Sequence, residues 1–318
     1  MGGRTVWPEL RWAAWRDTAE TLHMYTQVVG KIRLASTPIV NHWWNVPLYP
    51  TARGLTTSLM FHGATAFEIE LDLLAHRLEV ATSDGTLGAM PLVREPVSRF
   101  YARLMHLLRD LQLDVSIWTT PVEVPDPIPF EKDEVHASYD PGYVERFWRA
   151  LVATSRVLGE FRSRFIGKAS PVHFFWGSFD LALTLFSGRR APPRPDADRI
   201  TREAYSHEVL SFGFWPGGSG IDDAAFYAYA APEPGGFPDA PIRPAAAHYH
   251  PGLHEFVLPY AAVQGDADPD RRLLEFFESA YEAGIELGAW DRAALEREGA
   301  EEGARPWTPE PDRPVPLH

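Results

Sequence analysis

Four histidines are the residues of this sequence best suited to chemistry. His42 and His173 each open an expected strand, in the aromatic strings His-Trp-Trp and His-Phe-Phe-Trp. His207 opens a further expected strand, and His23 lies in the first expected helix. Imidazoles can shuttle protons near neutral pH. His42, His173 and His207 could also bind a divalent metal, and imidazoles without thiolates suit iron, manganese, zinc or copper. The alternative is that these histidines are hydrogen-bonded structural residues at helix–strand junctions.

Aromatic side chains close to these histidines are expected to line a mostly apolar pocket that binds substrate. They are Trp43, Trp44, Phe175, Trp176 and Trp215. Ligand pockets combine such walls with a few polar groups. Lys31 and Lys168 directly follow Gly30 and Gly167, and the two lysines could bracket an anionic small molecule. The alternative is that each lysine satisfies the last carbonyls of a helix.

A histidine-rich string runs from His248 to Glu255. Its His-x-His spacing and later glutamate match the first cupin motif, which offers imidazoles and a carboxylate to iron or manganese. The glycines that bracket that motif are missing, and no second motif supplies a third histidine. We therefore interpret His248 and His254 as surface histidines. Glycine-rich nucleotide loops, His-Glu-x-x-His and Gly-x-Ser-x-Gly are also absent.

Composition excludes several classes of protein. The 318-residue chain has a formal net charge of −13, which disfavours nucleic acid because a phosphate backbone requires a positive surface. It contains no cysteine, which excludes disulfides and thiol nucleophiles. No signal peptide or membrane-spanning run is recognisable. We therefore expect a cytoplasmic protein that takes a small-molecule ligand or substrate, with no nucleic-acid or membrane partner. The sequence does not determine its oligomeric state.

The elements that must position these residues occur twice. One helical stretch ends in Val-Val-Gly-Lys31 before His42, and another ends in Phe-Ile-Gly-Lys168 before His173. In each copy a short strand with a proline step then leads into an amphipathic helix. Self-similarity at a long period is typical of a duplicated unit. We predict an α+β fold made of an internally duplicated α-β-β-β-β-α unit, with mainly antiparallel sheets and a pseudo-twofold arrangement.

The boundaries follow from apolar periodicity and proline content. We predict a first repeat at 1–122, a Pro-rich connector at 123–140, a second repeat at 141–298 and a mobile tail at 299–318. In the first repeat we expect a helix from Pro8 to Gly30, strands at 46–57, 67–73, 78–82 and 115–119, and a helix at 96–112. In the second we expect helices at 141–166 and 269–288 and strands at 172–186, 206–215, 224–231 and 254–260.

Several strings of the sequence resemble the DUF5996 family of bacterial proteins. They include Trp7-Pro8, Thr21-Leu22-His23, Gln27 to Lys31, Asn41 to Trp44, His173 to Asp180, Ser206 to Glu208 and Phe226 to Tyr229. The resemblance covers roughly residues 7–297. Because the function of that family is unknown, the resemblance implies no activity. It does place His23, His42, His173 and His207 inside matching strings and leaves His248 outside them.

The sequence leads us to expect a small-molecule enzyme with a histidine-rich, aromatic-lined cleft between the two repeats. The cleft would work with a bound metal or by acid–base chemistry. One alternative is a non-catalytic protein that binds an apolar or anionic ligand with Lys31 and Lys168; another is a structural protein without a site. Convergence of the histidines indicates the enzyme, whereas lysines that face a closed aromatic cavity indicate the binding protein.

Overall fold

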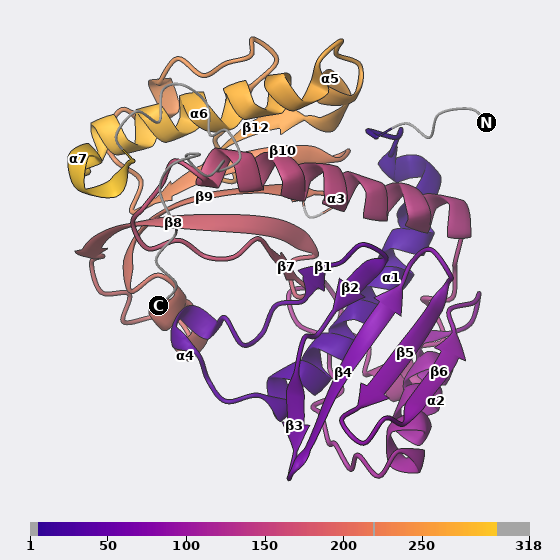
Figure 1. Cartoon of the computed structure of the whole chain (residues 1–318). Helices are drawn as coiled ribbons and strands as arrows, with labels where there is room; N and C mark the ends of the chain where they lie inside the picture. Colours follow the sequence, from indigo (N-terminus) through magenta and orange to yellow (C-terminus); the bar gives the residue numbers. More distant parts are fainter. Residues whose placement is uncertain (1–5, 219, 298–318) are drawn as a thin grey trace, which may run out of the picture.

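A long central helix separates the two sheets of the computed structural model, which describes residues 6–218 and 220–297 (Figure 1). This helix, α1 (Trp12–Ser36), buries Trp15, Leu22 and Val29 at intervals of seven residues, which is two helical turns. The predicted stop at Gly30 is wrong, because α1 continues to Ser36. Gly30 instead lies inside the helix against Trp176, where an added Cβ would be 2.2 Å from the indole ring.

Replacing Gly30 with alanine is expected to destabilise the protein by about 2–3 kcal/mol. The overlap of the new methyl group with the rigid Trp176 indole costs more free energy than the higher helix propensity of alanine gains. Gly159 lies in helix α3 (Pro141–Arg162) with open space around its Cα. The matched variant Gly159→Ala should therefore gain about 0.5–1 kcal/mol. Urea unfolding of both variants measures the difference. Equal effects at the two positions would contradict the packing of Gly30 on Trp176.

The N-terminal sheet is antiparallel and has the order β1-β2-β4-β5-β6, with β3 paired to β4. Its strands are β1 (Tyr49–Pro50), β2 (Gly54–Thr56), β3 (Met60–His62), β4 (Thr65–Asp72), β5 (Arg77–Thr82) and β6 (Leu87–Pro91). The predicted hairpin is present as β4 and β5, because alternating apolar residues bury one face of β4. Helix α2 (Val97–Asp110) follows and buries Phe100, Leu104 and Leu108.

The C-terminal sheet is also antiparallel, with the order β11-β12-β10-β9-β8-β7. Its strands are β7 (His173–Phe175), β8 (Asp180–Arg190), β9 (His207–Trp215), β10 (Ala225–Ala231), β11 (His248–His250) and β12 (Glu255–Pro259). One face packs on α3 and α6 (Pro269–Leu287). There Phe212 contacts Phe161 and Phe277, with ring centroids 4.7 and 5.9 Å away. Because side chains alternate along a strand, the other face is free to line a site.

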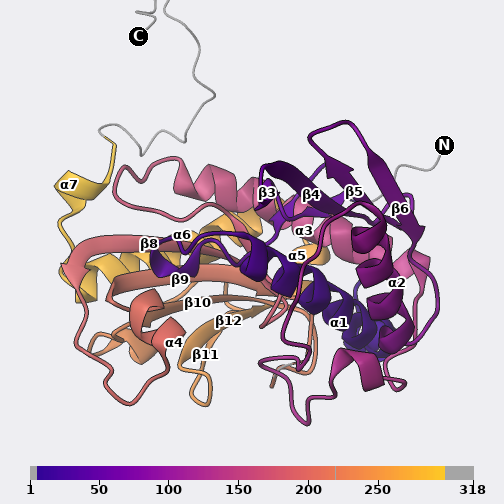
Figure 2. The ribbon, with the colours of Figure 1, turned by 90° about the horizontal axis from the view of Figure 1, so that it is seen from below.

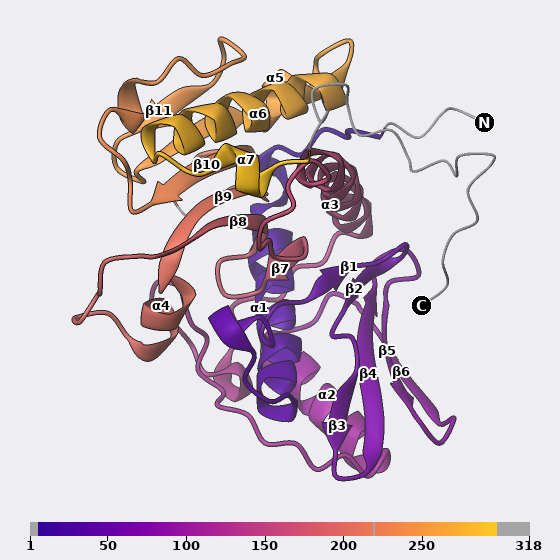
Figure 3. The ribbon, with the colours of Figure 1, turned by 60° about the vertical axis from the view of Figure 1, so that its left-hand side comes forward.

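Short helices complete the described chain. They are η1 (Asn41–Trp43), η2 (Phe130–Lys132), α4 (Arg199–Ala204), η3 (Phe237–Asp239), α5 (Tyr260–Gln264) and α7 (Arg292–Leu295). Figures 2 and 3 show α6 on one side of the C-terminal sheet and α1 with α4 on the opposite side. No helix in the described residues is both long and apolar enough to cross a membrane.

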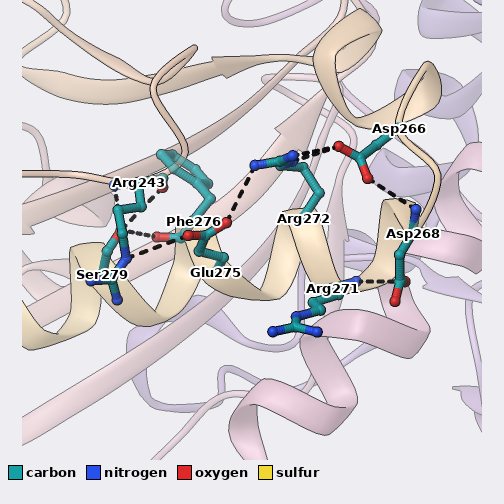
Figure 4. A network of polar contacts seen from close by, with 8 residues as sticks. All are labelled: Arg243, Asp266, Asp268, Arg271, Arg272, Glu275, Phe276 and Ser279. Carbon is teal, nitrogen blue, oxygen red and sulfur yellow. Dashed lines mark hydrogen bonds and ion pairs between the residues drawn. The ribbon is translucent and has the colours of Figure 1, made fainter.

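A polar network holds the start of α6 (Figure 4). Asp268 accepts a hydrogen bond from the backbone N–H of Arg271 at 3.2 Å and so caps the helix. Arg272 pairs with Asp266 at 2.7 Å and with Glu275 at 3.5 Å, and Glu275 also pairs with Arg243. Exposed ion pairs contribute little individually, so the network mainly fixes the direction in which the chain enters α6.

Four strand predictions are wrong. The region predicted as one strand at 46–57 is a hairpin, because β1 and β2 pair antiparallel with Tyr49 opposite Thr56. The region predicted as one strand at 172–186 is a hairpin, because Phe179 adopts a positive φ of 59° and the chain reverses before β8. His42 lies in η1, where it also has a positive φ, and not in a strand. The segment 115–119 belongs to no strand. Apolar composition alone cannot reveal such reversals, since an aromatic residue at positive φ is uncommon.

The fold class is confirmed at the level of mixed helices and antiparallel sheets. The duplication, its pseudo-twofold arrangement and the repeat boundaries stay predictions. The predicted tail at 299–318 lies outside the described residues. The chain just before the predicted Pro-rich connector is held against α1, because the Gln27 amide donates to the carbonyl of Val122 at 2.7 Å and accepts from its N–H at 3.0 Å.

Candidate functional site

A cavity of about 520 Å³ lies on the face of the C-terminal sheet that is turned away from α6, since Ser211 lines it while the neighbouring Phe212 packs on Phe277 of α6. Its walls come from the end of α1, η1, the connector, α4 and strands β7 to β10, with the first residue of β12. The strands present Ala182, Thr184, Ser211 and Tyr229 to it, because alternate residues such as Leu183 and Phe212 face the core. A cavity of this size accommodates a small organic molecule.

Aromatic rings form much of the wall. All five aromatic residues predicted from the sequence line the cavity, namely Trp43, Trp44, Phe175, Trp176 and Trp215. Trp118 joins them from the irregular segment before the connector, and Tyr205, Tyr227 and Tyr229 contribute phenol groups. The Tyr205 and Tyr229 hydroxyls are 2.9 Å apart and form a hydrogen bond. The walls therefore suit an apolar or aromatic body, and the phenols supply polar contacts.

Asp180 is the most deeply buried carboxyl group of the cavity, at 5% exposure. It accepts hydrogen bonds from Ser178 and from the phenol of Tyr227. The Tyr227 ring reaches Asp180 across β9 at Gly213, where an added Cβ would be 2.3 Å from the phenol oxygen. Burial raises the pKa of Asp180 to about 6, although both hydrogen bonds favour the ionised form. The group can therefore give or take a proton near neutral pH.

Two further carboxyl groups line the same cavity. Burial, and then the nearby Asp180, raise the pKa of Glu255 to about 8. One oxygen of Glu255, Oε2, is buried without a hydrogen-bond partner among the described residues. Glu123 is exposed as a whole residue, but its carboxylate lies against Gly177. Loss of solvent around that carboxylate, followed by repulsion from Asp180, raises its pKa. Asp180, Glu255 and Glu123 together form an acidic floor of the cavity.

Lys31 also lines the cavity, from the last two turns of α1. Its ammonium lies over the rings of Trp118 and Trp176, at 4.7 and 5.9 Å from their centroids. Burial lowers the pKa of Lys31 to about 8. Because Lys31 is inside α1 and not beyond its end, the alternative role as a helix C-terminal cation does not apply to it.

His42 lies at the edge of the cavity beside the second predicted lysine. The Lys168 ammonium donates to Nε2 of His42 at 2.6 Å, so Nδ1 carries the proton and donates to the carbonyls of Glu203 and Ala204. Burial, followed by the charge of Lys168, lowers the pKa of His42. Lys168 itself is not part of the cavity wall but lies over Trp44 and Phe186. His207 is close, with its ring 5.6 Å from that of His42.

The other two predicted histidines lie apart from this group. His173 is only 1% exposed, and its ring nitrogens have no hydrogen-bond partner within residues 6–218 and 220–297. Burial lowers the pKa of His173 to about 3. His23 donates through Nε2 to the carbonyls of Trp176 and Gly177 at 2.9 Å, and burial lowers its pKa to about 4. His23 thus fixes the turn before Asp180. Neither ring belongs to the cavity wall.

The predicted metal site of His42, His173 and His207 does not form as a ligand cluster. Within residues 6–218 and 220–297, no three His, Asp or Glu side chains are grouped so that they could hold a metal ion. The imidazole of His42 is already engaged at both nitrogens. The geometry of these residues therefore gives no support for a bound divalent metal.

Sequence reasoning missed the acidic and phenolic groups, although a signal for some of them was present. Asp180 is an isolated carboxylate between apolar residues, and Tyr227 and Tyr229 alternate within the strand string Phe-Tyr-Ala-Tyr. An unpaired acid in an apolar strand is unusual and indicates function or pairing. Trp118 and Glu123 carried no such signal, because irregular segments have no periodicity.

Comparison with known proteins gives a family and no activity. A family model described as a family of unknown function (DUF5996) matches residues 7–297. No curated protein and no solved structure matches the chain.

Proposed function

The chain belongs to the DUF5996 family of unknown function, and we propose that it binds a small organic molecule with an aromatic or otherwise apolar body. The cavity carries this proposal, because a cavity of about 520 Å³ lined by tryptophan and tyrosine side chains has the size and the lining of a ligand site. Lys31 and the carboxyls of Asp180 and Glu255 add the few polar groups that orient a ligand.

Acid–base catalysis on that molecule is the second candidate function. Asp180, with its Tyr227 hydrogen bond, and Glu255 favour it, because the pKa values of about 6 and about 8 bracket neutral pH. Groups with such shifted pKa values in a cleft are typical of catalytic sites. In this role Asp180 would accept a proton while Glu255 donates one.

Saturable binding of the dye 1-anilinonaphthalene-8-sulfonate tests the proposed function. Its aromatic body suits the walls and its sulfonate suits Lys31. We expect one molecule per chain, with affinity about tenfold lower in Ala204→Phe, because the new ring fills space at the cavity edge. Ala52→Phe is the matched control, since Ala52 is exposed and outside the cavity wall. Similar loss in both variants, or no saturation, would contradict binding in the cavity.

A further inference from the structure

Lys31 is a buried amine without a charged partner. It is 5% exposed, and the described residues form neither a hydrogen bond nor an ion pair with its ammonium; the rings of Trp118 and Trp176 are its recorded neighbours. A lysine retained for stability alone is normally exposed or paired, because burial of an unpaired ammonium is costly. Lys31 also lines the cavity, so its nitrogen is accessible to whatever the cavity holds.

We propose that Lys31 is an amine nucleophile that forms an imine with an aldehyde or ketone bound in the cavity. This inference rests on the proposed function, because it names the chemical class of the ligand in the same site. A lysine that is desolvated in an apolar pocket is the usual form of an imine-forming lysine. The aromatic walls provide that desolvation here.

Protonation is the main obstacle to nucleophilic attack by a lysine, because only the neutral amine has a free lone pair. Burial lowers the pKa of Lys31 from 10.5 to about 8. Near neutral pH this change raises the neutral fraction by roughly 300-fold over an ordinary lysine amine. The ring faces of Trp118 and Trp176 favour the ammonium, so they hold the nitrogen in place without fixing it in an ion pair.

Two carboxyl groups of the cavity, Asp180 and Glu123, lie on or against one turn of the chain. Trp176 packs under Lys31, Gly177 follows it and contacts the carboxylate of Glu123, and Asp180 begins the next strand. Burial raises the pKa of both carboxyls, and that of Asp180 reaches about 6. Asp180 can therefore give or take a proton near neutral pH, and the turn brings this proton donor to the same cavity as the amine.

The step balances without any other reactant. The lone pair of the Lys31 nitrogen adds to the carbonyl carbon; the nitrogen then gives up one proton and the oxygen takes one, which gives a neutral carbinolamine. A carboxylic acid of the floor then protonates that hydroxyl, which leaves as water while the C=N bond forms and the nitrogen loses its second proton. One amine and one carbonyl thus give one imine and one water, with no change of oxidation state.

Reductive trapping tests this inference, and the chain supplies its own controls. Its three lysines are Lys31, Lys132 and Lys168. Intact protein is incubated with benzaldehyde and sodium cyanoborohydride near neutral pH, and benzylated lysines are located by peptide mapping. We expect Lys31 to be labelled at least about tenfold faster than the exposed Lys132. Lys31→Met should abolish the fast label, while Lys132→Met should keep it.

Dye binding in the same samples distinguishes failure of imine formation from failure of the proposed ligand binding in the cavity. Slow labelling of Lys31, at or below the rate of Lys132, overturns the imine even if the dye still saturates at one site. Absence of both fast labelling and saturable dye binding overturns the proposed function as well. Because the label is mapped in the unaltered protein, the result does not depend on the folding of any variant.

Discussion

Replacing Gly213 with alanine is expected to destabilise the protein by about 3–5 kcal/mol and to separate Tyr227 from Asp180. The added Cβ would be 2.2 Å from the Leu181 carbonyl oxygen and 2.3 Å from the Tyr227 phenol, so backbone and ring would both have to move. Overpacking of this kind costs about 1–3 kcal/mol. Loss of a hydrogen bond to a charged group adds about 1.5–3 kcal/mol.

Urea unfolding of Gly213→Ala measures the loss, and Gly235→Ala is its control because a Cβ at Gly235 meets nothing within 4 Å. Tyr227→Phe removes the phenol oxygen alone and should account for about 1.5–3 kcal/mol of the effect. A Gly213→Ala protein as stable as Gly235→Ala would show that the Tyr227 ring does not cross β9 at this point.

Replacing Glu255 with glutamine is expected to stabilise the protein in alkali. The pKa of Glu255 is about 8 in the fold against an ordinary value of 4.5, so between these values the folded state binds the proton more strongly than the unfolded state. Stability contributed by this proton is present at low pH and is lost as the pH rises from about 4.5 through about 8. The neutral amide of glutamine does not titrate, so the variant does not lose this stability as the pH rises.

A shift of one pKa unit corresponds to about 1.4 kcal/mol of unfolding free energy. Because Glu255 is only half-buried, solvent screens part of this effect. We therefore expect the variant to gain about 2–3 kcal/mol of unfolding free energy above pH ~8.5. The gain should shrink to almost nothing near pH ~5. Unfolding free energies of the variant and of the parent across this range provide the test. Glu68→Gln, on an exposed position of β4, is the control. A gain that grows toward acid would contradict the placement of Glu255.

Local patterns predicted much of the fold and the aromatic wall. The hairpin of β4 and β5 follows from strict alternation, and helix α2 from its apolar stripe. Trp43, Trp44 and Trp176 were predicted to line a pocket because large aromatic residues cluster in the sequence, and they do line the cavity. Such features depend on residues that are close in the chain.

The features that were missed depend on tertiary contacts. The sequence pattern predicts that Gly30 ends a helix. In the structure Gly30 has no side chain because the indole of Trp176, a residue far along the chain, occupies that space. The sequence pattern predicts that Phe179 lies within an apolar strand. In the structure its positive φ reverses the chain, and Asp180 becomes the first residue of β8. The acidic floor contains Asp180 of β8 and Glu255 of β12, and two other strands lie between these two in the sheet. No local sequence pattern indicates that residues of two such strands line the same cavity.

The indole N–H signals of the tryptophans test the central claim most directly, because five of the eleven tryptophans line the cavity. In ¹H–¹⁵N spectra of labelled protein, saturating dye should shift the signals of Trp43, Trp44, Trp118, Trp176 and Trp215. The signals of Trp7, Trp15, Trp148 and Trp290, which are not part of the wall, should stay in place. Shifts confined to this second group would contradict a ligand site in the cavity.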